Sequence, residues 1–332
     1  MEPVKIFITR VIPSAGIKRL EEQGYQLTQW TEKRSLSTEE LVRICRDHHA
    51  LLSAGGSRLD ASFFSASSHL KAISLYSAGY DHVDIAAATA AGIPVGHTPG
   101  VLSGATADVA FLLILAVSRN AFYMHRQIER NGWNFYDPTA NLGIEISGKT
   151  LGIFGLGRIG TDLARKCRAA YGMKIIYHNR RRNEAAEKEL GAAYVSMDEL
   201  LEQSDVLSVH ANLSPELKGV FNEEAFRKMK PSAIFINTAR GGIHNETDLA
   251  AALKSGVIWG AGLDVTDPEP MQGNNELLYM PNVCVLPHIG SATVETRDAM
   301  ALMAADNLIA AIRGEEMPHC VNCRELRNAD RR

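Results

Sequence analysis

Three glycines, Gly155, Gly157 and Gly160, have the G-x-G-x-x-G spacing of a phosphate-binding loop. They directly follow the apolar residues 151–154, which predict a buried strand, and they open a helical pattern that continues to residue 170. A dinucleotide-binding loop needs this order of strand, turn and helix, because the helix N-terminus presents free N–H groups and a positive dipole end to the phosphates. Gly155 permits the tight turn, and Gly157 lets the backbone approach a pyrophosphate closely. The spacing and its context therefore predict a dinucleotide site.

Residues 174–178 predict the second strand of this region, and Asn179 follows it. In an NAD-specific site an Asp or Glu at this point binds the hydroxyl groups of the adenosine ribose. Arg180, Arg181 and Arg182 follow instead. An acid would repel a 2′-phosphate, whereas arginine binds it through charge-assisted hydrogen bonds. NADP(H) is thus favoured and NAD(H) is the alternative, although Arg181 and Arg182 also suit a solvated basic turn. Besides the glycines, the residues of the loop and turn that we predict to bind the cofactor are Arg158, Ile159, Asn179, Arg180 and Arg181.

Arg240, Glu269 and His288, which the resemblance described in the next paragraph singles out, have side chains that suit acid–base chemistry on a small acid. Hydride transfer to a keto group creates an alkoxide, and histidine is the side chain best matched to protonating it near neutral pH. A neighbouring carboxylate favours the imidazolium and orients the ring. Arginine binds a substrate carboxylate through a planar two-point contact. Taken singly, each residue could be structural, as a cap or a turn residue.

Four segments, in their order along the chain, resemble those of the D-isomer-specific 2-hydroxyacid dehydrogenases, and especially the glyoxylate/hydroxypyruvate reductase branch of that family. The segments are residues 155–160 (GLGRIG), 236–242 (INTARGG), 262–270 (GLDVTDPEP) and 286–293 (LPHIGSAT). The likeness covers nearly the whole chain. It implies that Arg240 binds the substrate carboxylate and polarises its carbonyl, that Glu269 pairs with His288, and that His288 donates the proton. The implied reaction is reduction of glyoxylate or hydroxypyruvate to the D-2-hydroxy acid by hydride from NADPH.

The resemblance also implies further contacts. Backbone N–H groups of Ala78 and Gly79 would bind the substrate carboxylate together with Arg240 and His288, and Asp264 would accept from the nicotinamide carboxamide. Thr106 would reach a phosphate. The remaining residues that would line the cofactor are Asn212, Thr238, Ala239, Arg240, His288 and Gly290.

Several positions depart from the residues that are usual in the family. Asn212 stands where proline is usual, His244 where valine is usual, and Gly104 where an acid is usual. None of them belongs to the set of Arg240, Glu269 and His288, but Asn212 would alter how the ribose or nicotinamide sits. Residues 132–138 resemble the aromatic loop of the reductase branch, with Tyr136 where tryptophan is common; the alternative is a surface loop with buried anchors.

Alternating strand-like and helical patterns predict the elements that position these residues. The patterns cover residues 5–10, 13–23, 25–30, 38–48, 50–54, 71–77 and 93–98, then a long helix over 105–129, a second alternating series over 150–287, and a helix over 294–313. Such alternation is typical of parallel sheets with helices on both faces. We expect an α/β protein with two Rossmann-like doubly wound parallel-sheet domains and a cleft between them.

The length of 332 residues exceeds that of a single hydrophobic core, so two domains are expected. The residues after His288 are too few for a domain and are expected to return to the first sheet. The predicted boundaries are residues 1–101 and 290–332 for a discontinuous, flavodoxin-like substrate-binding domain and 102–289 for the dinucleotide-binding Rossmann domain. The family and the long helix suggest a homodimer.

Composition argues against several function classes. A net charge of −3 gives no reason to bind nucleic acid or an acidic membrane surface. The N-terminus lacks a signal-peptide pattern and the apolar run 109–117 is too short to span a bilayer, so a cytoplasmic protein is expected. The five cysteines do not suggest a disulfide framework. Cys320 and Cys323 form a C-x-x-C without a second ligand pair or a redox context, so no metal or redox role is expected.

Two kinds of alternative function stay open. A 2-ketogluconate reductase or another D-2-hydroxyacid dehydrogenase would look similar at this level. A nucleotide-sensing protein of the corepressor type shares the fold and the same three residues, but such proteins often carry disordered tails rich in proline and serine, which this chain lacks.

Overall fold

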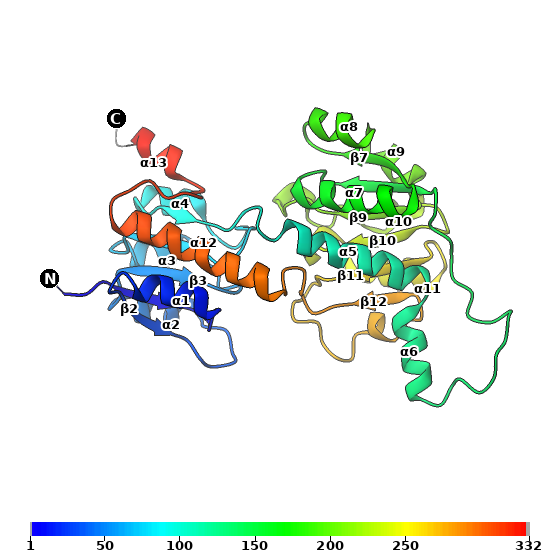
Figure 1. Cartoon of the computed structure of the whole chain (residues 1–332), viewed down its shortest axis with the longest axis horizontal. Helices are drawn as coiled ribbons and strands as arrows, with labels where there is room; N and C mark the ends of the chain where they lie inside the picture. The colour runs from blue at the N-terminus through cyan, green and yellow to red at the C-terminus, as the bar shows by residue number, and fades with distance from the viewer. Residues whose placement is uncertain (1, 330–332) are drawn as a thin grey trace. The chain divides into compact units, whose positions relative to one another are not determined.

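The computed structural model describes residues 2–329. The chain divides into two compact units, Met1–Leu102 with Ala292–Arg332, and Ser103–Ser291 (Figure 1). Each unit is an α/β layer structure built on a parallel sheet, as the alternating pattern predicted.

The sheet of the first unit has five parallel strands in the order β2-β1-β3-β4-β5. The strands are β1 (Lys5–Ile8), β2 (Gln26–Gln29), β3 (Ala50–Ser53), β4 (Ala72–Leu75) and β5 (Val95–Gly96). Every residue of β3 and β4 is buried, as expected for central strands covered on both faces. The short β5 is the edge strand next to β4.

Two helix layers cover this sheet. One face packs against α1 (Ser14–Glu21) and α12 (Val294–Ile312), and the other against α2 (Thr38–Cys45), α3 (Ala61–Ala66) and α4 (Ile85–Ala90). Successive strand residues pack into the hydrophobic cores on opposite faces of the sheet. Ile6, for example, packs in the core with α12, and Phe7 packs in the core with α2. Helix α12, orange in Figure 1, therefore returns to the first sheet from the far end of the sequence. A short helix, α13 (Cys323–Ala329), follows it.

The sheet of the second unit has seven parallel strands in the order β12-β11-β10-β9-β6-β7-β8. The strands are β6 (Thr150–Phe154), β7 (Lys174–His178), β8 (Ala193–Tyr194), β9 (Val206–Val209), β10 (Ile234–Asn237), β11 (Gly260–Leu263) and β12 (Val283–Val285). From β6 the chain continues to β7 and β8 toward one edge of the sheet, and from β9 it continues to β10, β11 and β12 toward the other edge. The switch point between β6 and β9 is where open α/β sheets bind ligands, at the carboxyl ends of the strands.

Helices cover both faces of this second sheet. Helices α5 (Ser103–Ser118), α7 (Arg158–Tyr171) and α8 (Glu184–Leu190) contribute to one core. The other core is formed with α9 (Met197–Gln203), α10 (Glu223–Lys228) and α11 (Glu246–Lys254). The helix that follows the glycine loop is thus α7, and it starts at Arg158.

The single helix predicted over residues 105–129 is wrong. The chain instead forms α5 and a second helix, α6 (Ala121–Glu129), at an angle of 64°. The break falls at Asn120, whose φ of 52° is left-handed, a conformation that asparagine tolerates better than most residues. Within residues 2–329, no single helix is both long and apolar enough to cross a membrane.

Candidate active site

His288 and Glu269 form a hydrogen-bonded pair in the second unit. The distance between His288 Nδ1 and Glu269 Oε1 is 2.6 Å, and both side chains are partly exposed. Partial burial raises the pKa of the Glu269 carboxyl, but the hydrogen bond and charge of His288 and the charge of Arg240 lower it, and the net pKa lies below its usual value. The three side chains predicted to act together are therefore electrostatically coupled.

His288 lies in a loop after β12 that Asp264 holds. Asp264 follows β11 and is 1% exposed. Its two carboxylate oxygens accept from the backbone N–H groups of Ile289 and Gly290 at 2.8 and 2.7 Å. Burial raises the pKa of Asp264, while these two hydrogen bonds oppose the rise. Asp264, predicted to bind the nicotinamide carboxamide, thus also fixes the residues that directly follow His288.

Arg240 lies in a loop after β10 that is organised by the buried Asn237 side chain. Asn237 Oδ1 accepts from Ala239 N at 2.9 Å, and Asn237 Nδ2 donates to the Arg240 carbonyl at 2.9 Å. Arg240 itself donates from Nη1 to the Ala239 carbonyl at 2.7 Å. The backbone on both sides of the Arg240 side chain is therefore tied to one amide group, which the sequence reasoning did not identify.

His244 forms a further hydrogen bond with the Asn237 side-chain amide. Asn237 Nδ2 also donates to His244 Nδ1 at 3.0 Å. Burial lowers the pKa of His244 to about 4, so the ring is neutral near pH 7 and can act as the acceptor. Its Nε2 atom has no hydrogen-bond partner among the described residues. The unusual residue at position 244 thus has a structural use, since it accepts the second amide proton of Asn237.

The glycine loop has the shape that a dinucleotide requires. Gly155 has a left-handed φ of 100°, and a Cβ there would lie 2.6 Å from the backbone nitrogen of Ala211. A Cβ on Gly160 would lie 2.8 Å from the Gly155 carbonyl oxygen, whereas Gly157, the N-cap of α7, faces open space. The first and third glycines are thus required by close packing, and the second leaves room for phosphate. The loop fits the cofactor that the motif predicts.

Asn179 and the three following arginines differ in their surroundings. Asn179 Oδ1 accepts from Leu156 N at 2.6 Å, which ties the turn after β7 to the glycine loop. Arg180 and Arg181 are exposed. Arg182 instead forms an ion pair with Glu187, at 2.6 Å between Nη2 and Oε2. The structure therefore separates Arg182, which supports the local fold, from its two neighbours.

The residues predicted to line the cofactor beyond the loop lie at the carboxyl ends of the second sheet or near them. Thr106, in the first turn of α5, is 5% exposed, and a Cβ on Gly290 would lie 3.2 Å from its methyl carbon. Thr238 is buried beside Arg240, and Asn212 is exposed after β9.

His210 is a further residue at this edge that the sequence reasoning missed. It follows β9 at the switch point, and its backbone carbon would contact a Cβ on Gly155 at 2.8 Å. Its Nε2 lies 2.8 Å from Ser208 Oγ, and its Nδ1 lies 3.4 Å from Thr238 Oγ1. Burial lowers the pKa of His210 to about 3, so the ring is neutral. Its position after the strand that adjoins β6 is the signal by which it could have been found.

Ala78 and Gly79 lie in the first unit, in the loop after β4. Ser77 Oγ donates to the Gly79 carbonyl at 2.7 Å, and His97 Nδ1 lies 2.9 Å from the Ala78 carbonyl oxygen. Because a carbonyl only accepts, His97 Nδ1 carries the proton of this contact. Both carbonyls of the loop are thus held within their own unit.

The aromatic tract at residues 132–138 is exposed. Trp133, Phe135 and Tyr136 have exposed fractions of 71%, 73% and 84%. Residues 132–138 are therefore a surface loop, as the alternative interpretation had it, but the buried anchors expected by that alternative are not found among them.

Comparison with known proteins gives the same family, by a family model for part of the chain and by relatives that cover nearly all of it. Residues 111–290 match the D-isomer specific 2-hydroxyacid dehydrogenase, NAD binding domain. The chain is 42% identical over 323 residues to a glyoxylate reductase of Korarchaeum cryptofilum, covering 97% of this chain and 96% of that protein. It is 43% identical over 326 residues to the glyoxylate reductase of Pyrococcus furiosus, with the same two coverages.

Solved structures of similar proteins point to the same family. A glyoxylate reductase from Paecilomyes thermophila matches with a TM-score of 0.86 and 36% identity, over 97% of this chain and 99% of that one. An NADPH-dependent glyoxylate/hydroxypyruvate reductase from Sinorhizobium meliloti, in complex with NADP and malonate, matches with a TM-score of 0.84 and 31% identity, over 96% and 97%. The resemblance found in the sequence is confirmed, and the chain belongs to the D-isomer specific 2-hydroxyacid dehydrogenase family.

Proposed function

We propose that this NAD(P)-dependent oxidoreductase, which reduces a 2-keto acid by hydride transfer, is an NADPH-dependent reductase of glyoxylate and hydroxypyruvate. The observation that carries the proposal is the pair of His288 and Glu269 beside the charge of Arg240. The relatives of the whole chain are named glyoxylate reductases, which favours this substrate class and an enzyme over a nucleotide-sensing corepressor.

The side chains divide the reaction between them. When bound, the reduced nicotinamide supplies the hydride. Arg240 binds the substrate carboxylate and polarises the neighbouring carbonyl. Because Glu269 occupies Nδ1 of His288, the proton that reaches the carbonyl oxygen comes from Nε2. The ionised Glu269 accepts the hydrogen bond from Nδ1 and so orients the ring for this transfer.

Substrate recognition also involves the first unit in this proposal. The backbone N–H groups of Ala78 and Gly79 bind the carboxylate that Arg240 binds. The hydrogen bond from His97 to the Ala78 carbonyl supports the role of Gly79, because that carbonyl and the Gly79 N–H belong to the same peptide group.

The preference for NADPH rests on the turn after β7. This turn offers the exposed Arg180 and Arg181 to a 2′-phosphate and has no acid in the position of Asn179. Arg182 contributes little in this proposal, because Glu187 already pairs with it.

The exposed aromatic tract supports a homodimer. Trp133, Phe135 and Tyr136 continue from α6 and present large apolar groups to solvent in the isolated chain. Exposed apolar clusters of this kind commonly mark an interface. Sedimentation of the purified protein at several concentrations tests the dimer, and a monomer at all of them would contradict it.

A substrate panel tests the proposed activity. Consumption of NADPH is followed by its absorbance with glyoxylate, hydroxypyruvate and 2-ketogluconate, and each rate is repeated with NADH. We expect the highest kcat/KM with glyoxylate or hydroxypyruvate and NADPH. A higher kcat/KM with 2-ketogluconate would overturn the substrate assignment, and equal or better use of NADH would overturn the cofactor preference.

A further inference from the structure

The segment before α13 extends the first sheet beyond its edge strand. Val321 N donates to the Val95 carbonyl at 2.8 Å, and His97 N donates to the His319 carbonyl at 3.0 Å. Gly96 and Cys320 form an antiparallel bridge between them. Residues 319–321 therefore complete the backbone hydrogen bonding of β5, which is only two residues long.

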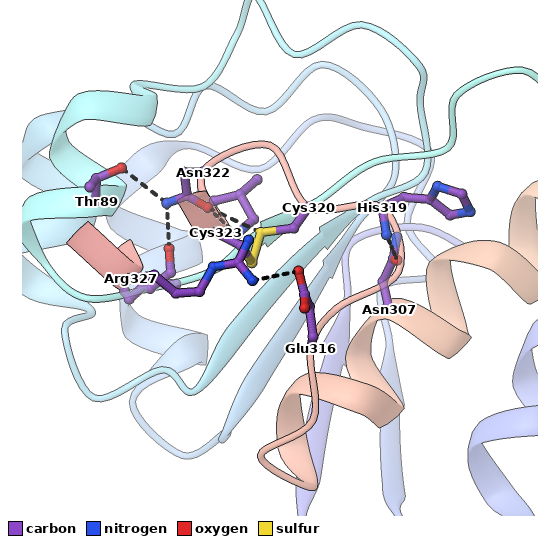
Figure 2. The surroundings of a disulfide bond; sticks show 10 residues. Thr89, Asn307, Glu316, His319, Cys320, Asn322, Cys323 and Arg327 are labelled. Atoms are coloured by element: carbon purple, nitrogen blue, oxygen red, sulfur yellow. Dashed lines mark hydrogen bonds and ion pairs between the residues drawn. A yellow bond between two sulfur atoms is a disulfide. The ribbon is translucent and has the colours of Figure 1, made fainter. Parts of the chain in front are cut away.

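Asn322 anchors this segment from within. It is fully buried, and its Oδ1 accepts from Val95 N at 2.9 Å. Its Nδ2 donates to the Ile93 carbonyl at 3.0 Å and lies 3.1 Å from Thr89 Oγ1. Figure 2 shows this amide pointing inward beside the disulfide. A single side chain thus joins the segment to β5 and to α4.

A disulfide between Cys320 and Cys323 encloses Asn322. The sequence predicted no redox role for these cysteines, whereas the structure bonds them to each other. Both residues are partly exposed, and Glu316 and Arg327 form an ion pair of 3.0 Å close by (Figure 2). The disulfide, although it packs against the core of the first unit, is therefore not fully enclosed by it.

The other cysteines, Cys45, Cys167 and Cys284, are buried and outside any disulfide. Burial raises their pKa values to about 12, 12 and 11, so they form little of the thiolate that exchange requires. The five cysteines thus divide into three buried thiols and one partly exposed disulfide.

Hydrogen bonds connect this segment to the loop that carries Ala78. Asn307 of α12, which is fully buried, accepts from His319 N at 3.0 Å and donates to the His97 carbonyl at 3.0 Å. His97 in turn donates from Nδ1 to the Ala78 carbonyl at 2.9 Å. The residue next to Cys320 is therefore linked, through two buried or half-buried side chains, to a proposed substrate-binding peptide.

From this arrangement we infer that Cys320 and Cys323 are a redox-active thiol–disulfide pair whose reduction weakens binding of the keto acid. Opening the ring around Asn322 loosens the pairing of residues 319–321 with β5, and His97 then holds the Ala78 loop less firmly. The inference rests on the proposed role of Ala78 and Gly79 in binding the substrate carboxylate.

The chemistry needs a dithiol as reductant. Its thiolate attacks one sulfur of the disulfide, the bond between Cys320 and Cys323 breaks, and a mixed disulfide forms. The second thiol of the reductant then displaces the remaining cysteine as a thiolate. The reductant leaves as a cyclic or paired disulfide, having given up two electrons, and the two cysteines take up two protons.

The first test measures the redox state without using activity. The intact mass and the number of thiols that react in the native protein are measured after oxidised and after reduced dithiothreitol. We expect the reduced protein to gain two hydrogens and two reactive thiols, both mapped to Cys320 and Cys323. The same thiol count in both states would overturn the inference.

The second test measures the coupling. At saturating NADPH, we expect reduction to raise the KM for glyoxylate by roughly five- to tenfold, at the lower end of typical allosteric couplings, with little change in kcat or in the KM for NADPH. The double variant Cys320→Ser/Cys323→Ser should have the higher KM in both redox states. Asn322→Ala, which keeps the disulfide, should raise the KM even when oxidised. If the oxidised and reduced proteins, verified by their thiol counts, have the same KM for glyoxylate, the coupling is overturned.

Hydrogen exchange separates this inference from the proposed function. The backbone amides of Val95, His97 and Val321 should exchange faster in the reduced protein, whichever substrate the enzyme uses. Failure to reduce glyoxylate in either state, with faster exchange on reduction, would count against the proposed substrate alone. Unchanged exchange at these amides would count against the redox coupling itself.

Discussion

Nδ1 of His288 lies 2.6 Å from Oε1 of Glu269, although the two residues come from different loops of the second unit. This contact uses one ring nitrogen, so the proposed mechanism gives the proton transfer to the other. It also couples the protonation of the two groups, because the charge of His288 helps to lower the pKa of Glu269.

Replacing His288 with alanine removes the proposed proton donor. We expect His288→Ala to lower kcat by about 10²-fold or more, the usual contribution of a general acid. Binding of NADPH, measured by fluorescence titration, should be nearly unchanged because the glycine loop is intact. Turnover close to that of the unmodified enzyme would remove His288 from the mechanism.

Replacing Glu269 with glutamine tests the electrostatic coupling. Without the carboxylate the His288 ring loses the acceptor that orients it, so kcat/KM should fall in Glu269→Gln. The pKa of Glu269 is lower in the folded chain than in the unfolded one, and its ionised form therefore stabilises the fold above the unfolded pKa. That contribution is lost as the pH falls through the lower folded pKa.

The unfolding free energies of the unmodified enzyme and Glu269→Gln, compared from neutral to acid pH, check this second effect. The difference between the two proteins should shrink on acidification. A difference that stays constant over the whole range would show that Glu269 does not act through its charge.

Arg240→Lys tests whether the planar guanidinium is needed. Lysine keeps the charge but cannot make a two-point contact with a carboxylate, so we expect a large rise in the KM for the keto acid. Steady-state kinetics at saturating NADPH measure it. Full activity of Arg240→Lys would show that charge alone is enough.

His244→Val tests the network that positions Arg240. Valine removes the acceptor of Asn237 Nδ2 and leaves a buried N–H unpaired, which costs roughly 1–3 kcal/mol. We expect a lower unfolding free energy and a higher KM for the keto acid, with the KM for NADPH little changed. The matched control is His125→Val, on the exposed surface of α6, which should have no effect on either. Equal behaviour of the two variants would assign no role to His244.

Arg180→Ala tests the cofactor preference. A charge-assisted hydrogen bond contributes roughly 1.5–3 kcal/mol, so its loss should reduce the ratio of kcat/KM with NADPH to that with NADH by about 10- to 100-fold. Arg182→Ala is the control, because Arg182 is paired with Glu187 and should leave the ratio nearly unchanged. A larger effect at Arg182 than at Arg180 would reverse the assignment.

The sequence by itself determined the parallel α/β class, the position of the glycine loop and the family, because these depend on local patterns. Gly155 and Gly160 could be recognised from the sequence because the motif itself requires glycine at both positions. In the structure a Cβ at either position would lie within about 3 Å of backbone atoms. Arg240, Glu269 and His288 could be named from their motifs, and the chemistry of each side chain follows from its type.

Only the tertiary structure decided how these residues are held. The turn at Asn120 interrupts an apolar pattern that continues on both sides of it, so periodicity alone could not show the break. Three side-chain contacts could not be predicted from spacing along the sequence. Asp264 accepts hydrogen bonds from Ile289 and Gly290, Asn237 contacts His244, and Cys320 is bonded to Cys323. Each depends on where neighbouring strands and loops end relative to one another, and that is set by the packing of the whole sheet.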